Sequence, residues 1–181
     1  MIETERLILR PLNHRQLEKY IKLDNSLEEE LKVKPAKREI SPDLMEALEY
    51  FIMPNVANPL KNHLFFTLWT MVWKEKNCLV GDLCFVGEPN ELGEVEIGYG
   101  TYENFRNMGF MSEAVSGIIN WFKPYLNAVL ASTEKDNPAS ANVLLKNNFV
   151  TYSSDETLVY WRMDIARWRM FCTLDYKFFF V

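Results

Sequence analysis

The segment from Gly93 to Ala114 holds the residues whose types and spacing are best suited to bind phosphate. It passes from an expected strand, through a polar loop, into an expected helix, and Arg106 and Gly109 stand where the helix begins. A helix N terminus presents unpaired main-chain amides and a partial positive charge, which together bind a diphosphate. Gly109 would let the backbone approach the phosphates, and Arg106 would add a charged contact. Taken alone this is a weak signal, because the same pattern is common in ordinary connections.

A carboxylate suited to general-base chemistry lies on the strand before that loop. Alternation places Glu94, Glu96 and Gly98 on the face opposite Val95 and Ile97. Desolvation of a carboxylate on a central strand raises its pKa toward the range in which it can take a proton near neutral pH. We therefore expect Glu96 to act as the base, directly or through a water, with Glu94 as a weaker candidate. The alternative is that both glutamates form a solvated strand face.

Residue patterns for several other chemistries are missing from the sequence. There is no glycine-rich fingerprint of an ATPase or a dehydrogenase. His14 and His63 have no serine or cysteine partner at a recognisable spacing, and we interpret them as packing or surface residues. Cys78, Cys84 and Cys172 show neither a metal-ligand spacing nor an even disulfide framework. We therefore expect no metal, a reducing compartment, and a small core role for Cys84.

The length and charge of the chain limit its partners. It has 181 residues and a formal net charge of −5, which favours one domain and gives no basic block for nucleic acid or an anionic membrane. No apolar run approaches the ~18 residues of a membrane span, and the first ten residues lack a signal-peptide core. We expect a cytoplasmic protein. The adjacent charged runs 28–30 and 32–38, of opposite sign, are expected to form a solvated helix or loop.

Hydrophobic periodicity and turn signals predict the order of helices and strands. Strands are expected at 5–11, 63–73, 78–86, 95–102, 127–132, 149–153 and 157–164, and helices at 13–23, 41–53, 109–122 and 137–147. Asn13, Ser41 and Asn137 are the expected helix N-caps, the last two followed by proline. Three antiparallel strands followed by helix–strand–helix–strand predict an α/β (α+β) fold with one mixed sheet and helices on both faces.

The last residues, 166–181, differ from the rest of the chain. They include Trp168, Phe171, Tyr176 and the run Phe178–Phe180, and such a segment is too apolar to remain solvated. We expect an extension, separate from the domain of residues 1–165, that adds a strand, covers a sheet edge or forms a subunit interface. A homodimer through this tail is one hypothesis.

Three blocks of the sequence carry a resemblance to a known family. The run Glu96-Ile-Gly-Tyr, followed by Arg106-x-x-Gly-Phe-Met-Ser-Glu-Ala, resembles the acetyl-CoA-binding region of the GNAT superfamily, whose motif is Arg/Gln-x-x-Gly-x-Gly/Ala. Residues 3–12 and 137–149 are similar to the opening strand and the Asn-x-x-Ser…Lys-x-Gly-Phe block of its ribosomal-protein-alanine N-acetyltransferase-like (RimJ/RimL type) group. The resemblance covers about residues 3–164, and the blocks have the family's order and spacing.

The resemblance implies a single GNAT-like domain with a mixed, mostly antiparallel sheet of about seven strands. It also implies that the strand at 95–102 is bulged and splays from the strand at 127–132, with the thioester in the gap. The cofactor would then be bound by Ile97, Gly98, Tyr99, Arg106, Asn107, Met108, Gly109, Phe110, Met111, Ser112, Asn137 and Ser140. In this arrangement the main-chain amides at 97–99 bind the thioester carbonyl, and the Ser140 hydroxyl lies near the departing sulfur as a proton donor.

Several positions depart from the family pattern. Met111 replaces a small residue, and Asn107 and Met108 replace the usual Gly-Lys, which puts cofactor affinity in doubt. Asn148 replaces a glycine, a mild change because Asn also adopts the left-handed conformation at a helix C terminus. A tyrosine that many wider relatives use as an acid falls at Leu144, which cannot donate a proton.

The function implied is transfer of an acetyl group from acetyl-CoA to a primary amine by direct attack in a ternary complex. A protein N terminus and a small-molecule amine both remain possible acceptors, and the resemblance places their cleft between the first two helices and the loop around 153–156. Two alternatives stay open. One is a catalytically silent relative that binds acetyl-CoA, and the other is a protein-interaction domain.

Overall fold

The computed structural model describes residues 1–165. The extension of residues 166–181 lies outside them, and so do Cys172 and the added strand or interface expected there. None of the described helices has the length and apolar character needed to cross a membrane.

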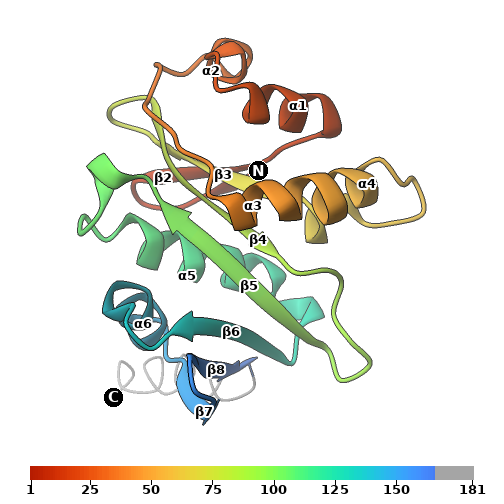
Figure 1. Cartoon of the computed structure of the whole chain (residues 1–181), viewed down its shortest axis with the longest axis vertical. Coiled ribbons are helices and arrows are strands. Elements are labelled where there is room, and N and C mark those ends of the chain that lie inside the picture. Colours follow the sequence, from red (N-terminus) through yellow and green to blue (C-terminus); the bar gives the residue numbers. More distant parts are fainter. Residues whose placement is uncertain (166–181) are drawn as a thin grey trace, which may run out of the picture.

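One twisted sheet of eight strands forms the centre of the described chain (Figure 1). The strands are β1 (Ile2–Glu3), β2 (Leu7–Pro11), β3 (Leu68–Trp73), β4 (Cys78–Phe85), β5 (Glu94–Thr101), β6 (Ala128–Glu134), β7 (Val150–Ser154) and β8 (Leu158–Asp164). Their order is β1-β2-β3-β4-β5-β6-β8-β7, and every neighbouring pair is antiparallel except β5–β6. The mixed, mostly antiparallel sheet is confirmed, with the short β1 as the strand that the sequence did not predict.

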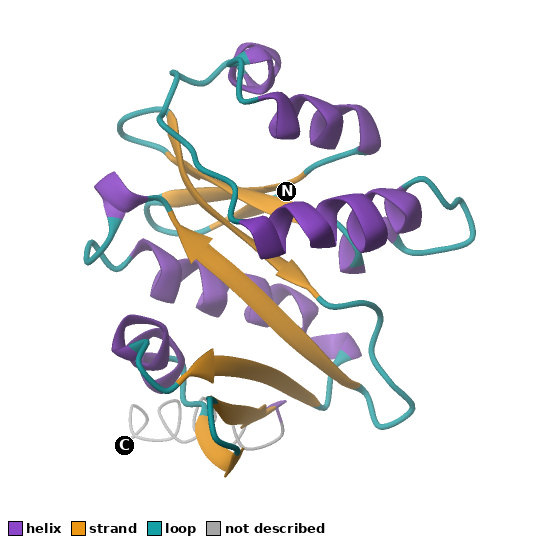
Figure 2. Ribbon diagram, in the orientation of Figure 1, coloured by secondary structure: helices purple, strands orange, loops and turns teal. Residues whose placement is uncertain are grey.

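Helices cover both faces of the sheet, as expected (Figure 2). One face carries α1 (His14–Lys22), α2 (Ser26–Leu31), α3 (Pro42–Ala47), a π-helical turn η1 (Leu48–Ile52) and α4 (Met53–Val56). The other carries α5 (Phe110–Phe122) and α6 (Pro138–Lys146). Each face has its own apolar core: Leu17, Tyr20 and Leu48 belong to the first, and Ile118 and Leu144, all fully buried, to the second.

Side-chain caps fix the helix starts that position the site. Asn13 and Gln16 form a reciprocal capping box at α1, and the Ser41 hydroxyl accepts the amide of Leu44 at α3. At α6 the Asn137 side chain accepts the amide of Ser140 at 3.0 Å. The expected N-caps are therefore confirmed.

The end of α6 also follows the sequence. Asn148 has φ +62°, and the amide of Phe149 donates to the Leu144 carbonyl at 3.1 Å. The left-handed conformation expected at the helix C terminus is therefore confirmed.

Two predicted elements have different bounds in the structure. The expected strand at 63–73 begins only at Leu68, because Asn62 caps a 3-10 turn, η2 (His63–Phe65), and the Trp69 indole donates to the Leu64 carbonyl. The helix expected to stop near residue 53 continues through η1 into α4. Pro54 falls in the first turn of α4, a position that tolerates its missing amide hydrogen.

The expectation of a fully solvated charged segment at 28–38 is wrong for two residues. Arg38 and Glu28 form a buried ion pair, with Nε–Oε1 at 2.8 Å and side chains 2% and 1% exposed. Arg38 Nη1 also donates to the Tyr20 carbonyl at 2.9 Å. The two charges can be buried because α2 and the following loop bring opposite signs into direct contact, a relation that residue order alone does not show.

Strands β5 and β6 diverge along their length, which opens the centre of the sheet. Their parallel pairing ends at Glu96 and Leu130, whereas β5 continues to pair with β4 as far as Thr101. The splay implied by the resemblance is therefore confirmed. The bulge expected in the same strand is not, since the β4–β5 register runs without a shift from Phe85–Ile97 to Gly81–Thr101.

A bulge lies in β4 instead. Met71 of β3 pairs with Gly81 whereas Val72 pairs with Leu79, so Val80 is an extra residue in β4. An extra residue reverses the alternation of side chains along a strand. As a result, Asp82 faces the α1–α3 side of the sheet rather than the core beneath α5.

Candidate active site

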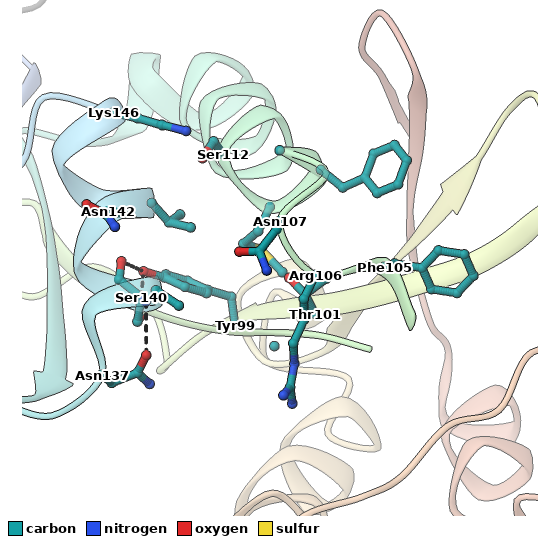
Figure 3. A pocket seen from close by; sticks show the side chains of 16 residues that line it. Tyr99, Thr101, Phe105, Arg106, Asn107, Ser112, Asn137, Ser140, Asn142 and Lys146 are labelled. Carbon is teal, nitrogen blue, oxygen red and sulfur yellow. Dashed lines mark hydrogen bonds between the residues drawn. The ribbon is translucent and has the colours of Figure 1, made fainter. Parts of the chain in front are cut away.

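A cavity of about 700 Å³ opens between the free end of β5, the start of α5 and the first turns of α6 (Figure 3). It is lined by Tyr99, Gly100, Thr101, Phe105, Arg106, Asn107, Gly109, Phe110, Met111, Ser112, Asn137, Ala139, Ser140, Asn142, Val143 and Lys146. Of the twelve residues proposed from the sequence as cofactor-binding, the lining includes all except Ile97, Gly98 and Met108. We call it the first cavity.

The loop into α5 turns main-chain amides toward this cavity. Asn107 and Gly109 have φ +62° and +77°, so two residues of the turn before the helix are in the left-handed conformation. The first amide to bond inside the helix is that of Glu113, which donates to the Gly109 carbonyl at 3.2 Å. Within the described chain the amides of residues 110–112 have no hydrogen-bond acceptor, as is usual for the first turn of a helix. They form a concave set of donors suited to an anion.

The far side of this loop is fixed to the N-terminal strand pair. Arg6 Nε and Glu113 Oε2 form an ion pair at 2.7 Å, and Arg6 Nη1 donates to the Met108 carbonyl at 2.9 Å. Thr4 Oγ1 and the Arg6 amide also donate to Glu113 Oε1, at 2.6 and 2.7 Å. These bonds hold the turn from both sides, so the amides of α5 have a defined position before any ligand arrives.

A tyrosine–serine contact lies at the other wall of the cavity. Ser140 Oγ donates to the Tyr99 hydroxyl at 2.9 Å, and that hydroxyl donates to the Ser140 carbonyl at 3.0 Å (Figure 3). Burial raises the pKa of Tyr99 to about 12 against the opposing hydrogen bond from Ser140, so the phenol stays protonated. Both hydroxyls are therefore protonated, and each donates to an acceptor at this wall.

A second cavity, of about 510 Å³, lies on the α1–α3 side of β5. Its lining includes Tyr20, Asp82, Cys84, Gly98, Gly100 and Tyr102. Tyr99, Gly100, Thr101 and Arg106 line both cavities. The two cavities therefore meet across β5, at the strand segment that β6 leaves unpaired.

Asp82 lies buried in the second cavity. It is 5% exposed, and its Oδ2 accepts the hydroxyls of Tyr20 and Tyr102, both at 2.7 Å. Its Oδ1 is buried and has no hydrogen-bond partner among the described residues. Burial raises the pKa of Asp82 to about 6, although the hydrogen bonds from Tyr102 and Tyr20 lower it. A carboxyl group in such a state can change protonation near neutral pH.

A family model described as an acetyltransferase (GNAT) domain matches residues 6–150. The chain belongs to the GNAT acetyltransferase family. The match includes β5, the loop to α5 and α6, so all three walls of the first cavity lie within the family domain.

Similar proteins agree with this membership. A Bacillus subtilis (strain 168) protein named uncharacterized N-acetyltransferase YjdG is 29% identical over 163 residues, covering 89% of this chain and 96% of the relative. The solved structure of RimL, a ribosomal L7/L12 α-N-protein acetyltransferase, in complex with coenzyme A has a TM-score of 0.63 at 15% identity, covering 89% and 95% of the two chains. A chimera of the spermidine N-acetyltransferase SpeG from Vibrio cholerae has a TM-score of 0.62 at 14% identity, covering 92% and 99%.

The chain is therefore an acetyl-CoA-dependent N-acetyltransferase, and the GNAT membership expected from the sequence is confirmed. The first cavity of this GNAT enzyme fits the coenzyme in its chemistry. It offers the free amides of residues 110–112 and the cation of Lys146 for phosphate. Met111, which replaces a small residue of the family motif, is 4% exposed and packs in the core beneath α5, so its side chain leaves the cavity open.

The structure also locates the predicted residues outside the first cavity. Met108 is exposed, and its carbonyl accepts from Arg6. Ile97 is buried in the core, and Gly98 lines the second cavity. In Figure 3 the Arg106 side chain extends away from Lys146 on α6, and Arg106 lines both cavities.

Backbone direction decides which amides of β5 face the gap. Val86 donates to the Glu96 carbonyl at 2.9 Å, and Tyr102 donates to the Val80 carbonyl at 3.0 Å. Even-numbered residues of β5 therefore bond toward β4, and odd-numbered ones point toward β6. Of the three amides expected around a thioester carbonyl, that of Tyr99 faces the gap. The amide of Gly98 faces β4, and that of Ile97 points to β6 beside the last paired residues, Glu96 and Leu130.

The two glutamates of β5 differ in their partners. Glu94 forms an ion pair with Arg162 at 2.6 Å, and this contact holds its pKa below the usual range. Glu96 lies on the predicted face and accepts the Ser132 hydroxyl at 3.0 Å, but it lines neither cavity. The ion pair makes Glu94 a poor base.

Sequence reasoning missed Asp82 and misjudged Cys84. Asp82 is the single charged residue in the apolar run 78–86, which is the signal that could have identified it. Cys84 is half-buried and lines the second cavity instead of only filling the core, and burial raises its pKa to about 11. The second cavity draws residues from α1 and α3, but none from the loop around 153–156.

Proposed function

We propose that this enzyme transfers the acetyl group of acetyl-CoA directly to a primary amine while both substrates are bound, one on each side of β5. The observation that carries the proposal is that the two cavities share Tyr99, Gly100 and Thr101. A thioester held in the gap beside these residues can be reached from the opposite cavity without a covalent enzyme intermediate. Bringing the two reactants together in this way supplies a large part of the rate acceleration.

The first cavity provides groups for each part of the acyl donor. The amides of residues 110–112 bind the diphosphate, and Asn137, which caps α6, contacts the pantetheine arm. The amide of Tyr99 points into the gap, where it stabilises the oxyanion that forms as the amine adds to the carbonyl. Because a charge-stabilising donor acts mainly in the transition state, this amide affects turnover more than ground-state affinity.

Proton donation to the departing sulfur is the proposed role of Ser140. Its hydroxyl donates to the Tyr99 hydroxyl, which stays protonated and itself donates to the Ser140 carbonyl. Release of the first contact would free the Ser140 proton for the sulfur. Leu144, at the position of the acid used by wider relatives, is fully buried in the core and has no access to the gap. A thiol pKa near ~8.5 makes thiolate a good leaving group, so this help is expected to be modest.

A general base is needed because an amine is protonated near neutral pH. The pKa is near ~10.4 for a lysine-like amine and ~8 for an N terminus. The base expected from the sequence, Glu96, accepts the Ser132 hydroxyl and lines neither cavity. Both histidines lie outside the two cavities, so a carboxylate is the group available on this face.

The acceptor is proposed to be a protein N terminus or a small-molecule amine. Solved proteins with this fold carry names of both kinds, a ribosomal-protein acetyltransferase and a spermidine acetyltransferase. The second candidate function is a silent acetyl-CoA-binding protein, favoured by the loss of the tyrosine at Leu144. That alternative predicts coenzyme binding without turnover.

Free-thiol release from acetyl-CoA, measured with a panel of amines, tests the proposal. The panel contains n-butylamine, a diamine, a polyamine and peptides with free N-terminal alanine or serine. Thiol release that depends on one class of amine is the expected result. Tight coenzyme binding with no thiol release from any amine would favour the silent alternative.

A further inference from the structure

We infer that Asp82, rather than Glu96, binds the ammonium group of the acceptor and takes its proton, so that the acceptor is a cationic primary amine on an arm narrow enough to enter the second cavity. The inference rests on the proposed acetyl transfer and specifies the acceptor side of that site. Its four supports are an unpartnered oxygen, the local charge balance, an unobstructed strip of β5 and the position of Glu96.

The unpartnered oxygen is the first support. Asp82 Oδ2 is saturated by two tyrosine hydroxyls, whereas the buried Oδ1 has no donor among the described residues. A buried acceptor without a donor destabilises the folded state, and native proteins rarely leave one without a function. An ammonium group in the second cavity supplies a hydrogen bond and a positive charge to this oxygen.

The charges around Asp82 favour a cation. Tyr20 of α1 and Tyr102 after β5 are neutral donors, because burial raises the pKa of both hydroxyls well above the usual value. Arg38, from the loop after α2, is bound to Glu28 through both Nε and Nη2, so these two charges largely offset each other. Lys37, Glu39, Glu103 and Arg106 also line the second cavity, and Lys37 pairs with Glu39 at 2.9 Å. These two cations and two anions offset one another, so ionised Asp82 is a net negative charge in a low-dielectric environment. Such a group attracts an ammonium ion more strongly than it would in water.

Two glycines leave a strip of β5 without side chains between Asp82 and the gap. Asp82 pairs with Gly100 across the β4–β5 ladder, and Cys84 pairs with Gly98. A Cβ built on Gly100 would meet nothing within 4 Å, and one on Gly98 would lie 3.7 Å from Cys84 Sγ. An amine bound at Asp82 can therefore move along bare backbone toward the acyl carbon.

Glu96 lies too far along β5 to take a proton from an amine in the second cavity. It lies three residues from Tyr99, whose amide faces the gap, about 10 Å at ~3.3 Å per residue. Its carboxylate is partly exposed and already accepts the Ser132 hydroxyl. A base must lie within hydrogen-bond reach of the proton that it removes, directly or through one water. In the second cavity Asp82 meets this requirement.

The proton and electron balance is complete with these groups. Asp82 takes one proton from the ammonium, and the free nitrogen pair then forms the N–C bond to the acyl carbon. As the tetrahedral intermediate collapses, the C–S electron pair goes to sulfur, which takes the Ser140 hydroxyl proton to become a thiol. The second proton of the nitrogen then restores the Ser140 hydroxyl. The products are an acetamide, a free thiol and one proton, which Asp82 later releases to solvent.

The test compares Asp82→Asn with Glu96→Gln by free-thiol release, using the acceptor from the panel that gives the fastest turnover. Asp82→Asn is expected to lower kcat/KM by at least ~10²-fold, as for loss of a general base, while acetyl-CoA affinity is unchanged. Unchanged coenzyme affinity also shows that the variant is folded. Glu96→Gln is expected to keep most activity. The opposite order of effects would overturn the inference.

A pH profile separates the chemical role from a structural one. Loss of activity on the acid side is expected near the pKa of Asp82, about 6. Tyr102→Phe removes a hydroxyl that stabilises the carboxylate, so the acid limb of kcat/KM should move to higher pH. An acid limb that stays in place in this variant would contradict the assignment.

If the wild-type enzyme acetylates no amine, that result contradicts the proposed function and leaves the inference about Asp82 open. A binding measurement then tests the inference separately. The carboxyl carbon of Asp82 is titrated by NMR with n-butylammonium and, as a control, with tetramethylammonium, which has the same charge and no N–H. The inference predicts that n-butylammonium lowers the pKa of Asp82 more than the control does. Equal or absent shifts would overturn it.

Discussion

Replacing Gly109 by alanine tests whether the loop before α5 binds the coenzyme through its backbone. Gly109 has φ +77°, and a Cβ there would lie 3.5 Å from Arg6 Nη2, an ordinary contact. The cost is therefore backbone strain, about 1–2 kcal/mol for a residue with a side chain in the left-handed region. In a chain of this length that lowers Tm by roughly 2–8 °C.

If the strained loop relaxes, the amides of residues 110–112 change direction. Loss of one hydrogen bond to a charged phosphate costs about 1.5–3 kcal/mol, so the Kd for acetyl-CoA should rise roughly tenfold or more. Calorimetric titration measures this Kd, and thermal unfolding measures the stability loss. An unchanged Kd in a variant with a lowered Tm would refute the argument that backbone direction at this turn controls binding.

Gly87→Ala is the matched control. Gly87 has φ +89°, its added Cβ would meet only ordinary contacts at 3.7 and 3.8 Å, and it lines neither cavity. The strain and the loss of Tm should resemble those of Gly109→Ala, while the affinity for acetyl-CoA stays at the wild-type value. Equal losses of affinity in the two variants would mean that global destabilisation, not the loop, explains the effect.

Three further predictions follow from other contacts. Burial opposes ionisation of Glu113, but hydrogen bonds from Thr4 and Arg6 hold its pKa below the usual value. Ionised Glu113 therefore stabilises the fold above its unfolded pKa of ~4.3, and this stabilisation is lost as the pH falls through its lower folded pKa. In denaturant unfolding, the free energy of unfolding of Glu113→Gln should depend less on pH in that range than that of the wild type. Glu28→Gln should lower the free energy of unfolding by about 3–5 kcal/mol, because Arg38 is left buried and unpaired. Replacing both Glu28 and Arg38 by apolar residues should lower it much less. Ser140→Ala should lower kcat at an unchanged Kd for acetyl-CoA, and a kcat equal to wild type would remove Ser140 from proton transfer.

The fold followed from the sequence where local signals and burial agree. Asn13, Ser41 and Asn137 each precede a helix and each accept a main-chain amide, so the helix starts were predictable from residue type. Alternation correctly placed Glu96 opposite Val95 and Ile97. The three-block resemblance then supplied the sheet and the splay between β5 and β6, which no short-range signal encodes.

The rest depends on contacts between distant segments. The extra residue Val80 reverses the alternation of β4, so no reading of that strand by period alone could place Asp82 in the second cavity. The Arg38–Glu28 pair is buried only because a loop folds back on α1 and α2. The argument that a desolvated carboxylate on a strand is a good base does not specify which residue is buried. In the structure the buried carboxylate is Asp82, one strand away from Glu96.

The most direct test of the whole account is a calorimetric comparison of acetyl-CoA with S-acetylpantetheine, which has the same thioester arm and no diphosphate. If the α5 amides hold the coenzyme, acetyl-CoA binds at one site per chain and far more tightly than the truncated thioester. No heat with acetyl-CoA, or equal affinity for the two compounds, would contradict the central claim that these amides bind its diphosphate.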